Sequence, residues 1–136
     1  PDRSSDGHVL NNCSIVLKMT YQNTSILFTG DIESGVESVL LGQYGPVLKA
    51  DLLKVGHHGS QNSTSEGFLA MVRPGDAVIS VGEGNNYGHP APGCLSRLRG
   101  IGAAIHRTDT DGTMLYTIGA KSVSPEFPDL LASLEY

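Results

Sequence analysis

Short runs of alternating or continuous apolar residues along the chain predict a series of β-strands. The first two runs are separated by a turn at 22–24 and predict a β-hairpin. The last two are joined through 109–112, where the dipeptide Asp-Gly indicates a second hairpin. The predicted strands are Cys13–Tyr21, Ser25–Thr29, Ala50–Val55, Asp76–Val81, Ala103–Arg107 and Thr113–Ile118.

Helical spacing of apolar residues falls between these strands. Glu33–Gln43 places Val36, Val39 and Leu40 on one face and predicts a helix. Ser63 and Glu66 have the spacing of a capping box and predict a helix that stops before Pro74. A third helix is predicted from Pro92 through Leu98, ending at Gly100. The order ββαβαβαββ predicts an α/β (α+β) fold, with a mixed sheet packed against helices.

Composition fits one globular domain or part of one. The chain has 136 residues, is 39% hydrophobic and carries a net charge of -5, so its surface as a whole does not attract DNA. We find no apolar run as long as a membrane span and no signal peptide. Residues 1–11 are interpreted as a linker or truncated segment, and 120–136 as a C-terminal tail. Cys13 and Cys94 do not form a disulfide framework, and we expect both to be buried thiols.

Three predicted strand ends carry residues that can bind metals. Asp31 follows the second strand, His57 and His58 follow the third, and His89 follows the fourth. Loops at strand ends are where α/β proteins place reactive groups, so these side chains can converge. Carboxylate oxygen and imidazole nitrogen together suit zinc, manganese or iron.

Each of these residues also has an ordinary structural interpretation. Asp31 in a Gly-Asp turn can be a helix N-cap, and a His-His pair beside glycine can be a solvated loop. His89 alone can simply turn the chain into the next helix. We expect His106 to be a surface or hydrogen-bonded histidine and His8 to have no role. Ser60 lies near His58, but no G-x-S-x-G motif supports a serine hydrolase.

The ordered motifs LFTGD, KVGHHGS and N-x-YGHP together resemble the hydrolase domain of ComEC-type competence DNA-uptake proteins. The resemblance runs from about Asn11 to Ile118. It implies the C-terminal half of a metallo-β-lactamase fold, an αββα sandwich, with a partial hydrolase domain over 12–119. It also implies a bacterial protein.

The resemblance implies a hydrolase with two divalent metal ions, zinc or manganese, acting on phosphodiesters. Asp31 corresponds to the bridging carboxylate. The metal-binding histidine corresponds to His57, our first choice, or to His58, and we assign catalytic roles to Asp31, His58 and His89. Residues that contact the ligands or substrate are expected to be Asn12, Ser14, Ser60, Asn86 and His89.

Two departures from the family pattern affect the metal site. The leading His-x-Asp-x-Asp-His or His-x-His-x-Asp-His cluster is absent, because the histidines stand at 8, 57, 58, 89 and 106. Where many family members have Gly-His, this chain has Asn12-Cys13-Ser14, as ComEC-like members usually do. The resemblance therefore implies an incomplete site, and we expect this fragment alone to be inactive.

The predicted partners are DNA or another phosphodiester, the missing N-terminal half of the hydrolase domain, and a membrane channel domain of the parent protein. In that setting the domain is attached to the cell membrane on the extracytoplasmic side, while this segment itself is soluble. The alternatives are a free-standing soluble hydrolase of a small phosphodiester or ester, and a degenerate domain without catalysis.

Overall fold

The computed structural model describes residues 10–120 and 122–126, which form a five-stranded sheet, a two-stranded ribbon and several helices. The sheet has the order β1-β2-β3-β4-β5. Strands β1 and β2 are antiparallel, whereas the pairs from β2 to β5 are parallel. The sheet is therefore mixed, as predicted. Its strands are β1 (Leu17–Tyr21), β2 (Thr24–Phe28), β3 (Leu52–Lys54), β4 (Asp76–Ile79) and β5 (Ala104–Arg107).

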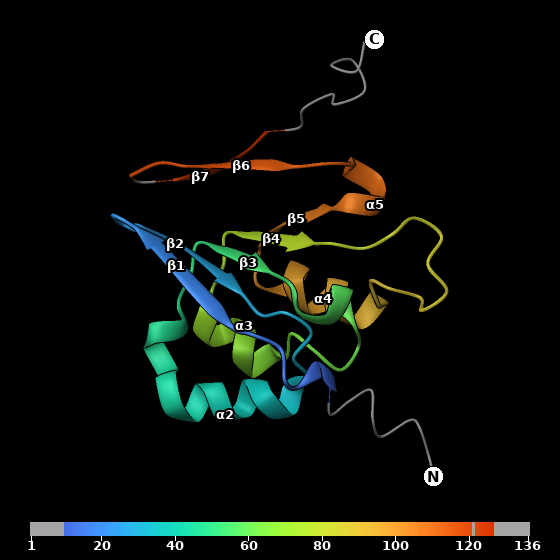
Figure 1. Ribbon diagram of the computed structural model, residues 1–136, viewed down its shortest axis with the longest axis horizontal. Helices are drawn as coiled ribbons and strands as arrows, with labels where there is room; N and C mark the ends of the chain where they lie inside the picture. The colour runs from blue at the N-terminus through green and yellow to red at the C-terminus, as the bar shows by residue number, and fades with distance from the viewer. Residues whose placement is uncertain (1–9, 121, 127–136) are drawn as a thin grey trace.

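Three α-helices lie on one side of this sheet (Figure 1). They are α2 (Ser34–Tyr44), α3 (Glu66–Val72) and α4 (Pro92–Gly100). Two short 3-10 helices are also present: η1 (Gly45–Leu48) follows α2, and η2 (Gly56–Gly59) follows β3. All three helices were predicted, and α4 begins at the expected proline because that position needs no backbone N–H donor. No helix within the described residues combines the length and apolarity needed to cross a membrane.

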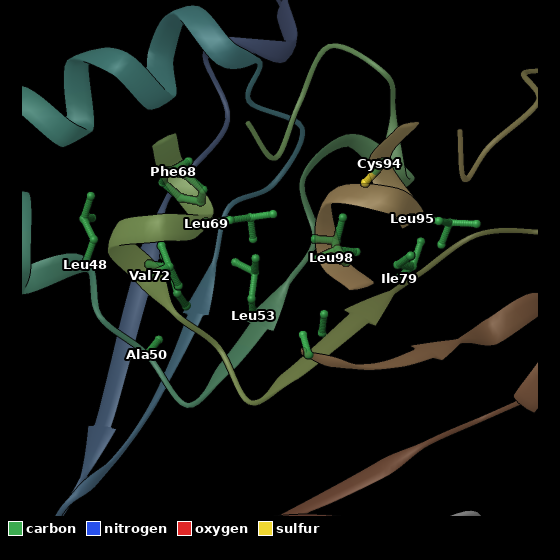
Figure 2. Close-up of a cluster of buried hydrophobic side chains, with 14 of the residues drawn as sticks. Leu48, Ala50, Leu53, Phe68, Leu69, Val72, Ile79, Cys94, Leu95 and Leu98 are labelled. Carbon is green, nitrogen blue, oxygen red and sulfur yellow. The ribbon is translucent and has the colours of Figure 1, made fainter. Parts of the chain in front are cut away.

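The hydrophobic core lies between the sheet and these helices (Figure 2). Leu53 of β3 and Ile79 of β4 are fully buried from the sheet side, and Phe68, Leu69 and Leu98 are almost fully buried from the helices. Burying such side chains stabilises the fold by about 1.5–3 kcal/mol each. The core therefore holds the sheet against the helices.

The capping box predicted at Ser63 is wrong, because Ser63 is used elsewhere. Its hydroxyl donates to the carbonyl of Gly56 at 2.9 Å, and the hydroxyl of Ser65 instead accepts the N–H of Phe68 as the cap of α3. Glu37 of α2 adds a second cap. Its carboxylate, 1% exposed, accepts the backbone N–H groups of Thr64 and Ser65. The loop that follows the two histidines is thereby tied to α2.

We expect Glu37→Ala to lower the free energy of unfolding by about 2–4 kcal/mol, because it leaves two backbone N–H groups without their charged acceptor. Glu37→Gln keeps the side-chain shape and one acceptor oxygen, and should cost about half as much. Val39→Ala, on the exposed face of the same helix, is the control. Urea unfolding measures all three. A Glu37→Ala midpoint equal to that of the control would show that this cap is dispensable.

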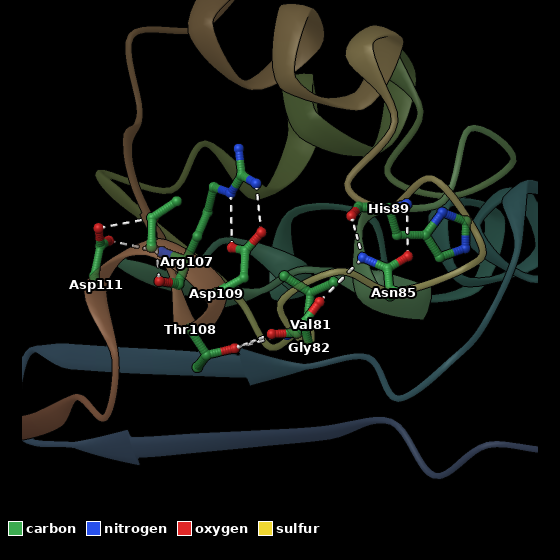
Figure 3. A network of polar contacts seen from close by, with 9 residues as sticks. Val81, Gly82, Asn85, His89, Arg107, Thr108, Asp109 and Asp111 are labelled. Carbon is green, nitrogen blue, oxygen red and sulfur yellow. Dashed lines mark hydrogen bonds and ion pairs between the residues drawn. The ribbon is translucent and has the colours of Figure 1, made fainter.

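The C-terminal strands differ from the predicted hairpin. A short helix, α5 (Thr108–Asp111), follows β5, and β6 (Leu115–Ile118) pairs with β7 (Val123–Glu126) rather than with β5. The predicted Asp-Gly hairpin is wrong because the carboxylate of Asp109 pairs with Arg107, and Asp111 accepts the N–H of Arg107 (Figure 3). No strand was predicted at β7. The ribbon β6–β7 lies on the side of the sheet away from the helices (Figure 1).

Strand β1 leaves a row of apolar side chains exposed. The predicted strand began at Cys13, but β1 begins at Leu17 and pairs only with β2 among the described strands. Leu17, Met19 and Tyr21 are 56%, 40% and 52% exposed. Lys18, on the alternate face, reaches the carbonyls of η1 on the helix side. The exposed row therefore lies on the sheet face away from the helices.

The two cysteines have different environments. Cys94 is buried in the core, and burial raises the pKa of its thiol. Cys13 is exposed, so the prediction that both thiols are buried is wrong for Cys13. Cys13 lies in the loop before β1 and not in a strand.

Candidate metal centre

The loop after β2 is held against the segment that precedes β1. The backbone N–H of Asp31 donates to the hydroxyl of Ser14 at 3.0 Å, and the N–H of Glu33 donates to the side-chain oxygen of Asn12 at 3.0 Å. Gly30 has a φ of +55°, and a Cβ there would lie 2.6 Å from Cβ of Ser14. Glycine is therefore required for this close approach, which sets the position of the Asp31 carboxylate.

The histidine turn after β3 has an uncommon backbone. His57 and His58 both have left-handed conformations, with φ of 45° and 54°. Such conformations cost about 1–2 kcal/mol for a residue with a side chain. Two backbone hydrogen bonds fix the turn. The N–H of His57 donates to the carbonyl of Gly30 at 3.1 Å, and the carbonyl of His57 accepts the N–H of Ser60 at 2.9 Å. These bonds join the histidine turn to the Asp31 loop.

His58 is the histidine that lies beside Asp31. Its Nε2 is 3.7 Å from Oδ1 of Asp31, and its Nδ1 is 2.7 Å from the carbonyl oxygen of Ser80. The carbonyl can only accept, so Nδ1 carries the proton and the lone pair of Nε2 faces Asp31. A ligating histidine usually has such a partner on its other nitrogen. Two ligands of one tetrahedral zinc ion lie about 3.4 Å apart, so the spacing of Asp31 and His58 suits a shared metal.

His57 has different neighbours. Its Nδ1 lies 3.5 Å from Oε1 of Glu33, and its Nε2 lies 3.4 Å from the side-chain nitrogen of Asn11. Sequence analysis placed His57 first as the metal ligand and did not identify Glu33. Both residues lie at the same edge of the sheet as Asp31, but the imidazole next to the Asp31 carboxylate is that of His58.

His89 approaches the pair from the loop after β4. Its backbone N–H donates to Oδ1 of Asn85 at 3.0 Å and its carbonyl accepts from Nδ2 of Asn85 at 2.7 Å (Figure 3). Its ring centroid is 5.7 Å from that of His57. Burial, and then the neighbouring His57 and His58, lower the pKa of His89. The lowered pKa favours the neutral form of the His89 imidazole.

Lys54 is a cation at this edge that sequence analysis missed. It ends β3, and its ammonium group donates to the carbonyl of Val55 at 2.9 Å. Burial lowers the pKa of Lys54, and the nearby Asp31 carboxylate opposes that shift. A lysine two residues before a Gly-His turn is an ordinary strand residue in sequence, so its charge beside Asp31 follows only from the strand pairing.

The remaining predicted residues have other positions. Ser60 is buried and its hydroxyl accepts the N–H of Asn62 at 3.3 Å, so it supports the turn. Asn86 is exposed and has no side-chain hydrogen bond among the described residues; the neighbouring Asn85 organises the loop instead. His106 lies 3.1 Å from Asp76 as a hydrogen-bonded histidine. His8 lies outside the described residues.

The described residues fit part of a metal site. Among residues 10–120 and 122–126, no group of three or more histidine, cysteine, aspartate or glutamate side chains is close enough to hold a metal ion. Asp31 and His58 have the spacing and the hydrogen bonding of two ligands. A catalytic zinc usually has three protein ligands and one water, so at least one further ligand is needed.

Comparison with curated proteins gives several bacterial relatives, and two of them are named as competence or ComE operon proteins. The chain is 40% identical over 121 residues to ComE operon protein 3 of Bacillus subtilis, covering 86% of this chain and 16% of that protein. It is 37% identical over 116 residues to the competence protein ComA of Neisseria gonorrhoeae, covering 85% of this chain and 17% of that protein. It is 38% identical over 102 residues to recombination protein 2 of Haemophilus influenzae, covering 75% of this chain and 13% of that protein.

The fold and the strand-end site place the chain in the broad class of α/β proteins with a mixed sheet. More particularly, it is a homologue of one segment of bacterial competence proteins, and it spans about a sixth of the length of the first of them. No family model matches the chain. No solved structure matches it either.

Proposed function

We propose that this chain supplies part of the active site of a metal-dependent phosphodiesterase or nuclease within a competence DNA-uptake protein. The observation that carries the proposal is the pair Asp31 and His58, 3.7 Å apart, with the second nitrogen of His58 bonded to a backbone carbonyl. The competence proteins to which the chain is homologous make DNA the favoured substrate. Both side chains are partly exposed, 47% for His58 and 37% for Asp31, so a metal ion and a substrate can reach them from solvent.

The chain's own residues would position and orient the reacting groups. Asp31 and His58 would hold a divalent metal, zinc or manganese, and Ser14 fixes the backbone of Asp31. When bound, a pair of such ions activates water and neutralises charge on a phosphodiester. His89 would bind a phosphate oxygen through a ring N–H, or, when protonated, would pass a proton to the leaving group. Its fixed backbone favours a single orientation of the ring.

The proposal extends to a metallo-β-lactamase fold. In that fold a second sheet would pack on the face away from the helices, and the exposed side chains of Leu17, Met19 and Tyr21 on that face support this arrangement. Exposed apolar rows of this kind mark interaction surfaces. The second sheet would belong to an N-terminal half that also supplies the missing ligands. A membrane channel domain and an extracytoplasmic position belong to the same proposal.

A comparison of the full-length protein with residues 1–136 tests the proposal. After metal removal and addition of zinc or manganese, the full-length protein should bind two ions and cleave a single-stranded oligonucleotide. Residues 1–136 alone should bind metal weakly and show no turnover, because three ligands are not assembled among the described residues. Metal stoichiometry and product formation measure both.

Other outcomes of these measurements would favour a different function or a complete metal site. Cleavage of a small diester but not of DNA would favour a free-standing type of hydrolase over an uptake nuclease. Metal binding without turnover on any ester would favour a degenerate domain. Tight binding of two ions with turnover by residues 1–136 would refute the incomplete site and require ligands such as His8 or His106.

A further inference from the structure

The loop after β4 presents an aromatic side chain to solvent beside the candidate metal centre. Tyr87 is 83% exposed, the same as Ile15 and higher than the other large hydrophobic residues of the described chain. One face of its ring stacks on His89, with centroids 6.0 Å apart and an interplanar angle of 25°. The other face is open to solvent.

The loop is organised before any ligand arrives. Asn85 accepts the N–H of Tyr87 at 3.1 Å and the N–H of His89 at 3.0 Å through the same side-chain oxygen. Its amide nitrogen donates to the carbonyls of Gly82 and His89 (Figure 3). One side chain thus fixes both the Tyr87 and His89 backbones. The loop backbone therefore needs little rearrangement when the Tyr87 ring binds a ligand.

A small cavity lies under this ring. Its volume is about 190 Å³, and its walls are His58, Val81, Gly82, Asn85, Tyr87 and His89. His58 is also the residue that pairs with Asp31, so the cavity and the candidate metal centre share this side chain.

The negative net charge of the chain favours a ligand that binds by stacking over one that binds through its phosphates. The chain has a net charge of -5, so general attraction to a phosphate backbone is weak. Proteins that bind single strands gain about 1–3 kcal/mol per base from stacking on aromatic side chains, and this term depends little on sequence. In duplex DNA the bases are already stacked on each other and cannot reach a side chain in this way.

From these observations we propose that Tyr87 is a base-stacking residue, which binds the nucleobase next to the cleaved phosphodiester and selects single-stranded DNA. The inference rests on the proposed function and names the substrate form for the same site. A base on the open face of Tyr87 continues the stack from His89.

The test compares variants of the full-length protein on two substrates. One is a thymidine oligonucleotide, and the other has the same length but abasic sites around the cleaved bond. Tyr87→Ala should raise KM for the thymidine substrate about 5- to 100-fold and change KM for the abasic substrate less than about twofold. Tyr87→Phe and Tyr87→Trp should keep the wild-type preference, because stacking needs only the ring. Tyr44→Ala, at another exposed tyrosine, is the control.

A measurement of DNA binding tests this inference independently of the proposed hydrolysis. Fluorescence anisotropy of a labelled thymidine oligonucleotide is measured with the Asp31→Asn protein and with the Asp31→Asn, Tyr87→Ala protein. A 5- to 100-fold weaker affinity in the double variant supports stacking even if the wild-type protein cleaves nothing. Equal affinities, or equal KM changes on thymidine and abasic substrates, overturn the inference and leave Tyr87 as a support for His89.

Discussion

Asp31→Asn in the full-length protein is expected to lower metal-dependent phosphodiester hydrolysis by about 100- to 1,000-fold, because an amide is a far weaker metal ligand than a carboxylate. The backbone N–H of Asp31 bonds to Ser14 and is unaffected by the change, so the loop should keep its position. Initial rates on a single-stranded oligonucleotide, at saturating manganese, measure the effect.

Glu66→Gln is the matched control, since it removes one carboxylate charge at an exposed helical position. Its rate should stay within about twofold of wild type, as surface substitutions rarely perturb a distant site. Thermal unfolding of both variants separates a lost ligand from a lost fold. If Asp31→Asn keeps its unfolding temperature and also keeps its activity, the carboxylate is not part of the reaction.

His58→Asn is expected to weaken metal binding by about 100-fold or more, whereas His57→Asn should weaken it by less than about tenfold. Asparagine tolerates the left-handed backbone of both positions better than alanine does, so the turn itself should persist. The difference is expected because Nε2 of His58, and not the ring of His57, lies beside Asp31. Competition with a zinc-binding dye measures both affinities.

The two histidine variants control for each other, because they are adjacent and carry the same substitution. Equal losses would mean that the two imidazoles share the metal. A larger loss for His57→Asn would restore the assignment that the sequence motif favours and would require the His57 ring to turn from Glu33 toward the metal.

The parallel part of the sheet could be predicted from sequence because its strands are short apolar runs separated by helical spacing. The C-terminal ribbon could not. The side chains of Asp109 and Asp111 fold back on Arg107, which satisfies the Asp-Gly segment without a hairpin. Strand β7 contains Pro125, and proline argues against a strand in any sequence pattern.

The sequence predicted which residues form the candidate site, but it did not predict which histidine lies beside Asp31. Asp31 and the two histidines each follow a strand directly, so their approach to one edge follows from sheet geometry. Which histidine faces Asp31 depends on two left-handed residues in a row, and no spacing rule signals that. The contribution of Asn85 rather than Asn86 likewise depends on the loop's hydrogen bonds.

The most direct test of the metal centre is a crystal structure of the full-length protein grown with manganese or zinc, with diffraction data collected at the metal absorption edge. We expect an anomalous peak within about 2.0–2.3 Å of both a carboxylate oxygen of Asp31 and Nε2 of His58. A fully occupied metal elsewhere, with these two side chains unligated, would contradict it.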